Sequence, residues 1–580
     1  MNSLVVVALA AGAFYLAFRF YSAHLGRRVL ALDAGRPTPA QQINDGVDYV
    51  PTRPSVLFGH HFASIAGLGP IVGPAIAVVW GWLPALLWVV LGSIFIGAVH
   101  DFAVLGISMR HRGRTIGDIA DEVLGPRARI LFMLIILFAI ALAMGVFALI
   151  ISDLFSYFGA DPAAQVSRAY PEAVIPSVGL IIVAVITGYL IHRRSFPFAP
   201  TVAVGVAVMF ALLAAGIAFP LMLEAKQLWI WLLLGYAFVA SVLPVWLLLQ
   251  PRDFLSSFNL YAMLALLAAA FIWGHPQITA PALRTEALGD PGGSLPALFP
   301  FLFITVACGA VSGFHCMVSS GTTSKQIRSE ADARAIGYGG MITEGFLAVI
   351  VIMACAAGYS AAEWGSLYKA GIGGTTVGVK IGAFVDGAAN IAASIGIPLL
   401  IGKTFLAVTI VAFALTTLDS GTRLIRYTIE ELARIARLPS RLNNRFVASA
   451  LAVGVIGYFA LMQIDGRPAG LALWKLFGTS NQLLAGIALL VATVYFFKQR
   501  RPTVYTFLPM LFMLSITTWA LALSLQGWLA DPAGNMPLIV VGGIIVLLLA
   551  WLIVEAAINF SAYRSKRRSE NGLAASGSRE

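Results

Sequence analysis

Two adjacent histidines lie in an apolar stretch that is long enough to cross a membrane. His60 and His61 precede segment 62–74, which holds three glycines and two prolines. Histidine titrates near pH 6.5, so it can accept and release a proton, and Pro70 and Pro74 each remove a backbone donor. Backbone outside the helical ladder is tolerated at membrane depth only inside protein or beside a water-filled cavity. The stretch therefore predicts a broken helix near the bilayer midplane, where transporters bind solutes and ions.

Other ionisable residues also fall within predicted membrane spans, where they are costly and so indicate function. They are His100, Asp101, His315, Glu344 and Asp419. His315 follows a second glycine-containing break at 308–313, as the first two histidines precede theirs, so we expect the breaks to meet at one cavity. The alternative is that each histidine is a neutral core residue bonded to a backbone carbonyl.

Segment 414–423 carries successive hydroxyl groups beside a carboxylate, Asp419. Hydroxyls that face the carbonyls freed by a broken helix form an all-oxygen site suited to a hard cation such as Na⁺. Asp419 could instead carry a proton. The alternative is that the hydroxyls bond to their own backbone and that Asp419 pairs with Arg423, one turn on.

These patterns predict two sets of site residues. The positive end of a half-helix suits a carboxylate, which favours an organic anion as substrate. The predicted substrate-binding residues are Ser64, Ala66, Gly67, Gly69, Gly309, Ser312, Gly313 and His315. The predicted proton- or ion-coupling residues are His60, His61, Thr416, Thr417, Asp419 and Ser420.

No catalytic, metal or cofactor motif is predicted. One alternative is a membrane-embedded enzyme with His60, His61 and His315 as metal ligands. Adjacent histidines on a helix point about 100° apart, which disfavours joint ligation of one ion. A nutrient sensor that does not transport is a further alternative, although no sizeable soluble output domain is predicted.

Composition fixes the broad class of the protein. Of 580 residues 59% are hydrophobic, and 11% are charged against about 25% in soluble domains. With a mean hydropathy of +0.87, the chain is expected to be an all-α, polytopic membrane protein. The net charge of +11 is attributed to basic loops rather than to nucleic-acid binding. The three cysteines lie in apolar segments, so neither a disulfide framework nor a zinc site is indicated.

A requirement for about 20 apolar residues per span predicts about 15 transmembrane helices. The second, ninth and thirteenth are predicted to be interrupted, the last of these at 478–482. An amphipathic stretch at 115–124 and a further helix at 376–395 lie between spans. The predicted spans are 3–21, 57–79, 83–109, 129–158, 175–192, 198–223, 228–249, 253–273, 297–323, 336–358, 399–423 with an extension to about 435, 446–463, 470–497, 504–526 and 537–561.

Positive charges alternate with these spans. If the N-terminus is outside, the inner connections hold 29 of the 38 lysines and arginines, Arg252 among them, and the outer ones hold 7. Adding or losing one central helix would invert every later loop. The positive-inside rule therefore predicts an outer N-terminus and a cytoplasmic C-terminus.

The same topology gives the two broken helices opposite orientations, a design found in transporters with inverted repeats. The expected divisions are an N-terminal helix and cytoplasmic segment 1–55, a first five-helix repeat 56–225, a two-helix insertion and outer loop 226–296, a second, inverted repeat 297–500, two C-terminal helices 501–562 and a cytoplasmic charged tail 563–580.

Several long motifs resemble the carbon starvation protein A (CstA) family, and the resemblance covers nearly the whole membrane region. The matching segments are 45–52, 58–74, 249–253, 309–315, 319–326, 415–423 and 477–484.

The resemblance implies a bacterial inner-membrane protein of the amino acid–polyamine–organocation superfamily, with a LeuT-like five-plus-five inverted repeat. It further implies an ion-coupled importer of pyruvate or small peptides, active during carbon starvation and driven by H⁺ or Na⁺ without a cofactor. By analogy with that fold, Thr416, Thr417 or Ser420 would supply the hydroxyls of its cation site. The choice between pyruvate and peptides, the coupling ion and the oligomeric state stay open at this point.

Overall fold

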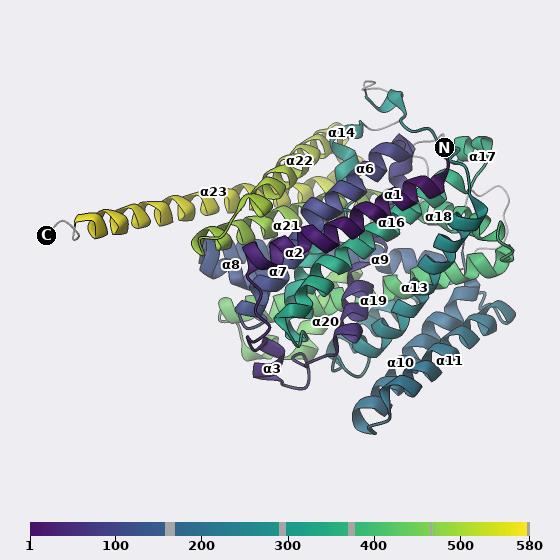
Figure 1. Cartoon of the computed structure of the whole chain (residues 1–580), viewed down its shortest axis with the longest axis horizontal. Coiled ribbons are helices and arrows are strands. Elements are labelled where there is room, and N and C mark those ends of the chain that lie inside the picture. The colour runs from purple at the N-terminus through teal and green to yellow at the C-terminus, as the bar shows by residue number, and fades with distance from the viewer. Residues whose placement is uncertain (157–168, 289–296, 369–376, 465–466, 469, 577–580) are drawn as a thin grey trace.

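The chain folds into a bundle of packed helices (Figure 1). The computed structural model describes residues 1–156, 169–288, 297–368, 377–464, 467–468 and 470–576. Within these ranges the only strands are the two-residue β1 (Gln463–Ile464) and β2 (Arg467–Pro468), which pair antiparallel. The all-α class predicted from composition is confirmed.

Eleven helical segments in the described part of the chain are long and apolar enough to cross a membrane, or up to twelve if one bent pair counts as a span. The chain is therefore a multi-pass membrane protein. The helices within the eleven segments are α1 (Ser3–Leu16) with α2 (Ser22–His24), α6 (Trp82–Gly92) with α7 (Ala98–Arg110), α9 (Pro126–Phe155), α10 (Val174–Arg193), α11 (Phe198–Ala218), α13 (Leu249–Gly274), α16 (Gly339–Ala357), α19 (Leu399–Ile435), α21 (Gly470–Lys498), α22 (Val504–Leu529) and α23 (Pro532–Ser576).

Three further predicted spans correspond to shorter helices. Two of them, α12 (Lys226–Val242) and α20 (Arg445–Leu461), have 17 residues each. The third is the pair α14 (Leu298–Thr305) and α15 (Gly313–Gly321). These are not among the eleven long helices, so the number of 15 spans and the inverted repeat stay predictions.

The remaining short helices lie between the long ones. They are α3 (Pro39–Ile43), α8 (Ile116–Leu124), α17 (Ala361–Tyr368) and α18 (Val377–Ala393). Helix α8 confirms the predicted amphipathic stretch, and α18 confirms the predicted extra helix.

Both predicted helix breaks at the two histidine motifs are confirmed. The first separates α4 (Pro54–Ile65) from α5 (Gly69–Ala77), which are bent by 46°. The second, at 306–312, separates α14 from α15. A Cβ atom on Gly69 would lie 2.3 Å from the Cβ of Cys308, and one on Gly73 would lie 2.6 Å from the carbonyl oxygen of Thr305. The two broken segments therefore run past each other in opposite directions. Only glycine at 69 and 73 permits backbones to pack this closely.

Other predicted boundaries are wrong. Helix α21 is continuous, so the predicted interruption at 478–482 is absent. Gly478 instead provides close packing, because a Cβ atom there would lie 2.4 Å from the carbonyl oxygen of Ile304. The first helical segment continues to Leu30, and α13 begins at Leu249 rather than 253. Helix α23 extends through most of the predicted tail, of which 577–580 lie outside the described residues.

The interior is built around α4, α9, α13 and α19. Helix α13 packs against both α4 and α19, and α9 packs against α19, α20 and α21. Helices α10 and α11 form a hairpin at the margin of the molecule, at the lower right of Figure 1, and α10 packs against α13. The predicted division, with 226–296 as the insertion, stays a prediction, although this packing makes α10–α11 the more peripheral pair.

Several arginine-rich connections meet at one face of the molecule, called here the basic face. The backbone amide of Val50 donates to the carbonyl of Lys325 (3.3 Å), and the hydroxyl of Tyr49 donates to the carbonyl of Arg112 (3.1 Å). Connection 193–197 lies beside 50–53, where both line one pocket. These loops are the ones whose charge predicted a cytoplasmic location.

Candidate functional site

The first helix break faces the hydroxyl groups of α19. The hydroxyl of Thr416 donates to the carbonyl of Ala63 (2.8 Å), and that of Thr417 donates to the carbonyl of Ser64 (3.2 Å). These carbonyls lie in the last turn of α4, where the following residues 66–68 leave the helical ladder. Side-chain hydroxyls thus replace the missing amide donors. This is the oxygen-rich arrangement that the sequence predicts.

Two further contacts complete this region. The hydroxyls of Ser64 and Ser420 lie 3.1 Å apart. Thr416 also lies 2.8 Å from the carbonyl of Phe413 in its own helix. Thr416 therefore combines the two alternatives, because its hydroxyl contacts a carbonyl of its own helix as well as one across the break.

A buried cluster containing one guanidinium group joins α4, α12, α13 and α19. It comprises His60, Tyr236, Arg252, Asp253 and Asp419, and is called the arginine cluster. His60 Nδ1 lies 2.6 Å from Asp253 Oδ2, and Arg252 Nη2 donates to Asp253 Oδ1 (2.8 Å). Arg252 also forms an ion pair with Asp419, to which Tyr236 donates a hydrogen bond (2.5 Å). The cluster links the broken helix to α19 through side chains alone.

The charges of the arginine cluster nearly cancel. Its one guanidinium is permanently protonated, and it faces two carboxylates, those of Asp253 and Asp419. With both carboxylates ionised and His60 neutral, the cluster carries one net negative charge. A single proton makes it neutral, which matters because an unbalanced charge is costly away from water.

A second buried cluster contains only titratable groups and lies between α4, α7, α15 and α16. It comprises His61, His100, Asp101, His315 and Glu344, and is called the histidine cluster. Asp101 accepts two contacts, from His315 Nδ1 (2.9 Å) and His100 Nδ1 (2.7 Å). His315 Nε2 lies 3.3 Å from Glu344 Oε2. No arginine or lysine in the described chain pairs with either carboxylate.

The histidine cluster also holds polar atoms without a hydrogen-bond partner among the described residues. They are the Nε2 atoms of His61, His100 and His315 and both carboxylate oxygens of Glu344, whose 3.3 Å contact with His315 is an ion-pair distance without a hydrogen bond. His61 uses its other nitrogen, which lies 2.8 Å from the hydroxyl of Thr323. Because buried polar groups are normally paired, these atoms are suited to receive water, protons or a polar solute.

Gly69 and Gly309, two of the predicted substrate-binding residues, lie where the two helix breaks pack together. A Cβ atom on Gly69 would lie 2.3 Å from the Cβ of Cys308, and one on Gly309 would lie 3.5 Å from the Cα of Pro70. Ser64, Ser312 and His315 are fully buried. The remaining predicted residues, all buried as well, are Ala66, Gly67, Gly69 and Gly313.

Two alternative interpretations of the sequence are wrong. His60, His61 and His315 each contact a carboxylate or hydroxyl through Nδ1 rather than a backbone carbonyl. Asp419 pairs with Arg252 instead of Arg423. Arg423 instead donates to other acceptors where α12 ends. They are the carboxylate of Asp48 (3.1 Å) and the carbonyls of Ala240 (2.9 Å) and Leu243 (2.5 Å).

Sequence reasoning missed two essential members of the arginine cluster. The sequence pattern assigns Arg252 to an inner loop and Asp253 to the first position of a span, whereas α13 starts one turn earlier and buries both. Pro251 was the available signal, because proline is tolerated in the first turn of a helix. Arg252 accordingly does not belong among the charges of the inner loops.

Asn481 of α21 was missed as well. Its side-chain oxygen accepts a hydrogen bond from the amide of Phe314 (2.8 Å), and its amide donates to Ser312 (3.1 Å). The polar residues at 478–482 therefore do not break the helix. One of them, Asn481, reaches from the intact α21 to the start of α15.

The predicted metal-enzyme alternative gains no support from this placement. Within the described ranges, no group of three or more His, Cys, Asp or Glu side chains is positioned to hold a metal ion. The three histidines proposed as ligands have three different partners.

Comparison with known proteins identifies the family. Residues 2–364 and 366–520 match the family described as carbon starvation protein CstA. The peptide transporter CstA of Campylobacter jejuni is 35% identical over 578 residues, covering 90% of this chain and 80% of that protein. The pyruvate/proton symporter BtsT of Escherichia coli is 32% identical over 607 residues, covering 90% and 82%.

A solved manganese transporter of Eremococcus coleocola aligns with 89% of this chain and 99% of its own, at 13% identity and a TM-score of 0.48. That similarity is too low to support an argument. The family match and the relatives above are sufficient, and this chain belongs to the carbon starvation protein CstA family.

Proposed function

We propose that this protein is a proton-coupled importer of pyruvate or short peptides that works by alternating access. The observation that carries the proton coupling is the histidine cluster, a fully buried group of side chains without a fixed cation. Its two carboxylates, Asp101 and Glu344, can be neutralised only by protons. The names of the two relatives, a peptide transporter and a pyruvate/proton symporter, support the substrate classes.

The proposed substrate site lies between the two breaks, at the predicted residues around Gly67 and Gly309. A substrate carboxylate there would neighbour the histidine cluster, where His61 offers a free Nε2 atom. A proton held on this cluster would compensate the negative charge of the anion in a low-dielectric interior. Substrate and proton would thus enter and leave together.

In this proposal the arginine cluster holds α4, the first half of the broken helix, against its neighbouring helices. Through the contact between His60 and Asp253 it holds α4 against α13, and through the pair between Arg252 and Asp419 it reaches α19. Uptake of one proton changes the charge of this cluster, so the hold on α4 depends on protonation. This dependence supports the proposal that His60 and Asp419 take part in ion coupling.

Sodium coupling is a second candidate because hydroxyls and carbonyls converge at the first break. Thr416, Thr417 and Ser420 face the carbonyls of Ala63 and Ser64. A sodium ion would accept all these oxygens as ligands. Gradient experiments distinguish the two ions directly.

The proposed location is the bacterial inner membrane, with the N-terminus outside and the basic face in the cytoplasm. The positive-inside rule supports this orientation. The proposed role is nutrient uptake during carbon starvation, which the family description supports.

The test is uptake of labelled pyruvate and of labelled di- and tripeptides into liposomes containing the purified full chain. An alkaline interior should drive accumulation, and a protonophore should abolish it. Accumulation driven by sodium alone would contradict proton coupling. Absence of gradient-dependent uptake of every one of these solutes would contradict the proposed transport function.

A further inference from the structure

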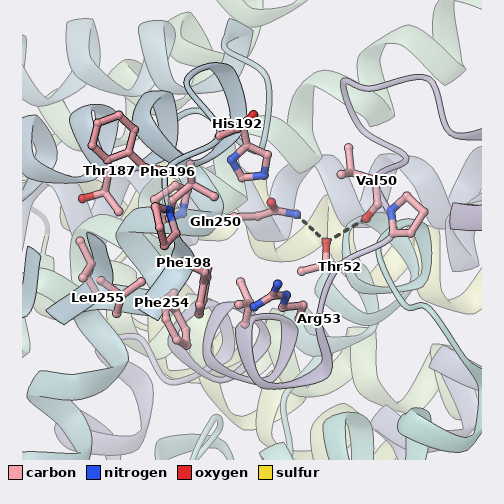
Figure 2. Close-up of a pocket in the computed structure, with 17 residues that line it drawn as sticks. Val50, Thr52, Arg53, Thr187, His192, Phe196, Phe198, Gln250, Phe254 and Leu255 are labelled. Carbon is pink, nitrogen blue, oxygen red and sulfur yellow. Dashed lines mark hydrogen bonds between the residues drawn. The ribbon is translucent and has the colours of Figure 1, made fainter. Parts of the chain in front are cut away.

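A pocket of about 450 Å³ opens at the basic face, and its lining includes Pro251 and Phe254, on either side of Arg252 and Asp253 in the chain. Its walls come from the segment before α4, the ends of α10 and α11, and the start of α13. Figure 2 shows His192 and Arg53 on opposite sides, with the amide of Gln250 between them and the rings of Phe198 and Phe254 beside Arg53. The pocket therefore combines a polar mouth with aromatic walls.

An apolar groove continues from this pocket along the outside of the α10–α11 hairpin. The two cavities share Thr187, Phe196 and Pro197. Apart from two threonines, the groove is lined by apolar residues, and its volume is about 370 Å³. Ile186 is 53% exposed and Val204 is 62% exposed, so both lie on the surface that faces lipid.

The groove has the direction and length of part of an acyl chain. Its residues on α10 extend from Val183 to Leu190, which is roughly 10 Å along a helix. It leads from the hydrocarbon region towards the polar mouth of the pocket at the basic face. An apolar groove of this kind would not stabilise a small polar solute.

Three arginines near this pocket lack a carboxylate partner among the described residues: Arg53 lines it, and Arg193 and Arg194 follow His192 of its wall in the chain. Arg53, Arg193 and Arg194 are exposed and form no ion pair with any residue that the structure describes. Each lies over an aromatic ring instead: Arg53 over Phe198 (4.8 Å), Arg193 over Trp246 (5.5 Å) and Arg194 over Tyr189 (5.9 Å). No aspartate or glutamate lines the pocket.

We propose that this pocket and groove bind one anionic phospholipid from the leaflet at the basic face. Its phosphate would lie at Arg53 and His192, near Arg193 and Arg194, and one acyl chain would lie in the groove between α10 and α11. Basic pockets between helices at a cytoplasmic surface have the charge that attracts such headgroups. The apolar groove is what separates this ligand from a free phosphate ion.

The site is connected to the arginine cluster by a short polar chain. Gln250 on the pocket wall donates to Thr52 (2.8 Å) and to the side-chain oxygen of Gln326 (2.7 Å). The amide nitrogen of Gln326 lies 3.4 Å from His60 Nε2. A lipid in the pocket therefore contacts residues that hold the start of α4, the broken helix.

The experiment measures lipid retention on the purified full chain by native mass spectrometry. Phosphatidylglycerol is compared with phosphatidylcholine of the same acyl chains. The unmodified protein should retain one phosphatidylglycerol per chain in preference to phosphatidylcholine. Since each basic residue near an anionic headgroup contributes roughly fivefold in affinity, the combined variant R53Q/R193Q/R194Q should lose at least tenfold.

The matched control is Arg445→Gln. Arg445 is also exposed, lies over an aromatic ring, that of Phe446 (5.1 Å), and lines no part of this pocket. Equal retention by this variant and by the combined variant would overturn the proposal. Thermal unfolding of each variant shows that the comparison is made between folded proteins.

A second pair of variants tests the acyl chain. Val204→Trp fills the groove without changing a charge and should reduce retention, whereas Leu508→Trp on the exposed side of α22 should not. Unchanged retention in Val204→Trp would overturn the groove assignment. Displacement of the lipid by inorganic phosphate would identify a free-anion site instead, and displacement by pyruvate would identify a solute vestibule; either result overturns the lipid proposal.

Discussion

The arginine cluster and the histidine cluster are both buried in the helix bundle, but they balance charge by different means. In the first, Arg252 supplies a positive charge that no change of pH removes. In the second, Asp101 and Glu344 face only histidines. One proton neutralises the first cluster, whereas the second needs two.

This difference separates fastening from proton handling. The fixed cation of Arg252 joins α13 to α19 at every pH at which the carboxylates of Asp253 and Asp419 are ionised. A cluster of histidines and carboxylates has no defined charge until protons arrive, so its packing and its protonation change together. We therefore expect substitution of Arg252 to affect mainly stability, and substitutions in the histidine cluster to affect mainly transport.

The largest effect is expected for Arg252→Gln. It leaves Asp253 and Asp419 buried without their cation, which should lower the free energy of unfolding by about 3–5 kcal/mol. The melting temperature in detergent measures this loss. Arg445→Gln, at an exposed position, is the control and should change stability by less than about 0.5 kcal/mol.

A double variant sharpens the interpretation of that loss. Adding Asp419→Asn to Arg252→Gln removes one of the two uncompensated charges, so part of the stability should return. If Arg252→Gln melts at the temperature of the Arg445 control, the arginine cluster does not fasten the helices.

Glu344→Gln in the histidine cluster should have the opposite effect to Arg252→Gln, with transport reduced and stability kept. The substitution keeps the size of the side chain and removes a charge that has no fixed cation, so the protein should stay folded. Uptake driven by a pH gradient should fall at least tenfold, about 1.4 kcal/mol. Glu363→Gln on the exposed part of α17 is the matched control. Unimpaired uptake in Glu344→Gln would remove this carboxylate from the coupling mechanism.

Thr416→Val tests whether hydroxyls, rather than ion pairs, hold the first break. The valine keeps the shape but leaves the carbonyl of Ala63 without its donor, which should cost about 1–2 kcal/mol. Thr518→Val on the exposed side of α22 serves as the control, since its hydroxyl bonds only within its own helix. A loss no greater than that of the control would show that the break does not depend on this contact.

The smallest effect is expected for Asp48→Asn at the basic face. Burial alone would raise the pKa of Asp48, but Arg423, Arg426 and Lys325 outweigh it, so the pKa lies below its usual value. A carboxyl whose pKa falls on folding stabilises the protein above its unfolded pKa, near 4, and this stabilisation is lost as pH falls through the folded pKa.

The asparagine variant should therefore be less stable at pH 7 by about 1 kcal/mol or less, and the difference should shrink as pH falls below about 4 and through the lowered pKa of Asp48. Unfolding measured from pH 7 to pH 3 checks this, with Asp531→Asn as the control. A difference that persists unchanged at low pH would mean that charge is not its origin.

Much of the helix pattern could be predicted because bilayer thickness and the positive-inside rule constrain it strongly. Glycine and proline placed both breaks, at 66–68 and 306–312, within a few residues. Glycine was a misleading sign of a helix break at 478–482, because glycine can allow close packing as well as a break. Only the neighbouring carbonyl of Ile304 distinguishes these uses, and a single sequence does not reveal it.

The site was predictable in its residue types but not in its pairings. His60, His61, His315 and Asp419 were identified because ionisable groups are rare in apolar spans. Their partners depend on how α13 and α19 pack, which periodicity does not specify. Arg252 illustrates the point, since one helical turn decides whether it is a loop charge or the centre of a buried cluster.

The exchange of backbone bonds for hydroxyl bonds at Ala63 and Ser64 has a consequence for motion. Tilting an intact helix at its middle requires backbone hydrogen bonds to break, at a cost for every carbonyl left bare. Here those carbonyls already bond to α19 through two side chains that can rotate. We therefore expect any change in the 46° angle between α4 and α5 to occur at 66–68, where it would break the fewest backbone hydrogen bonds.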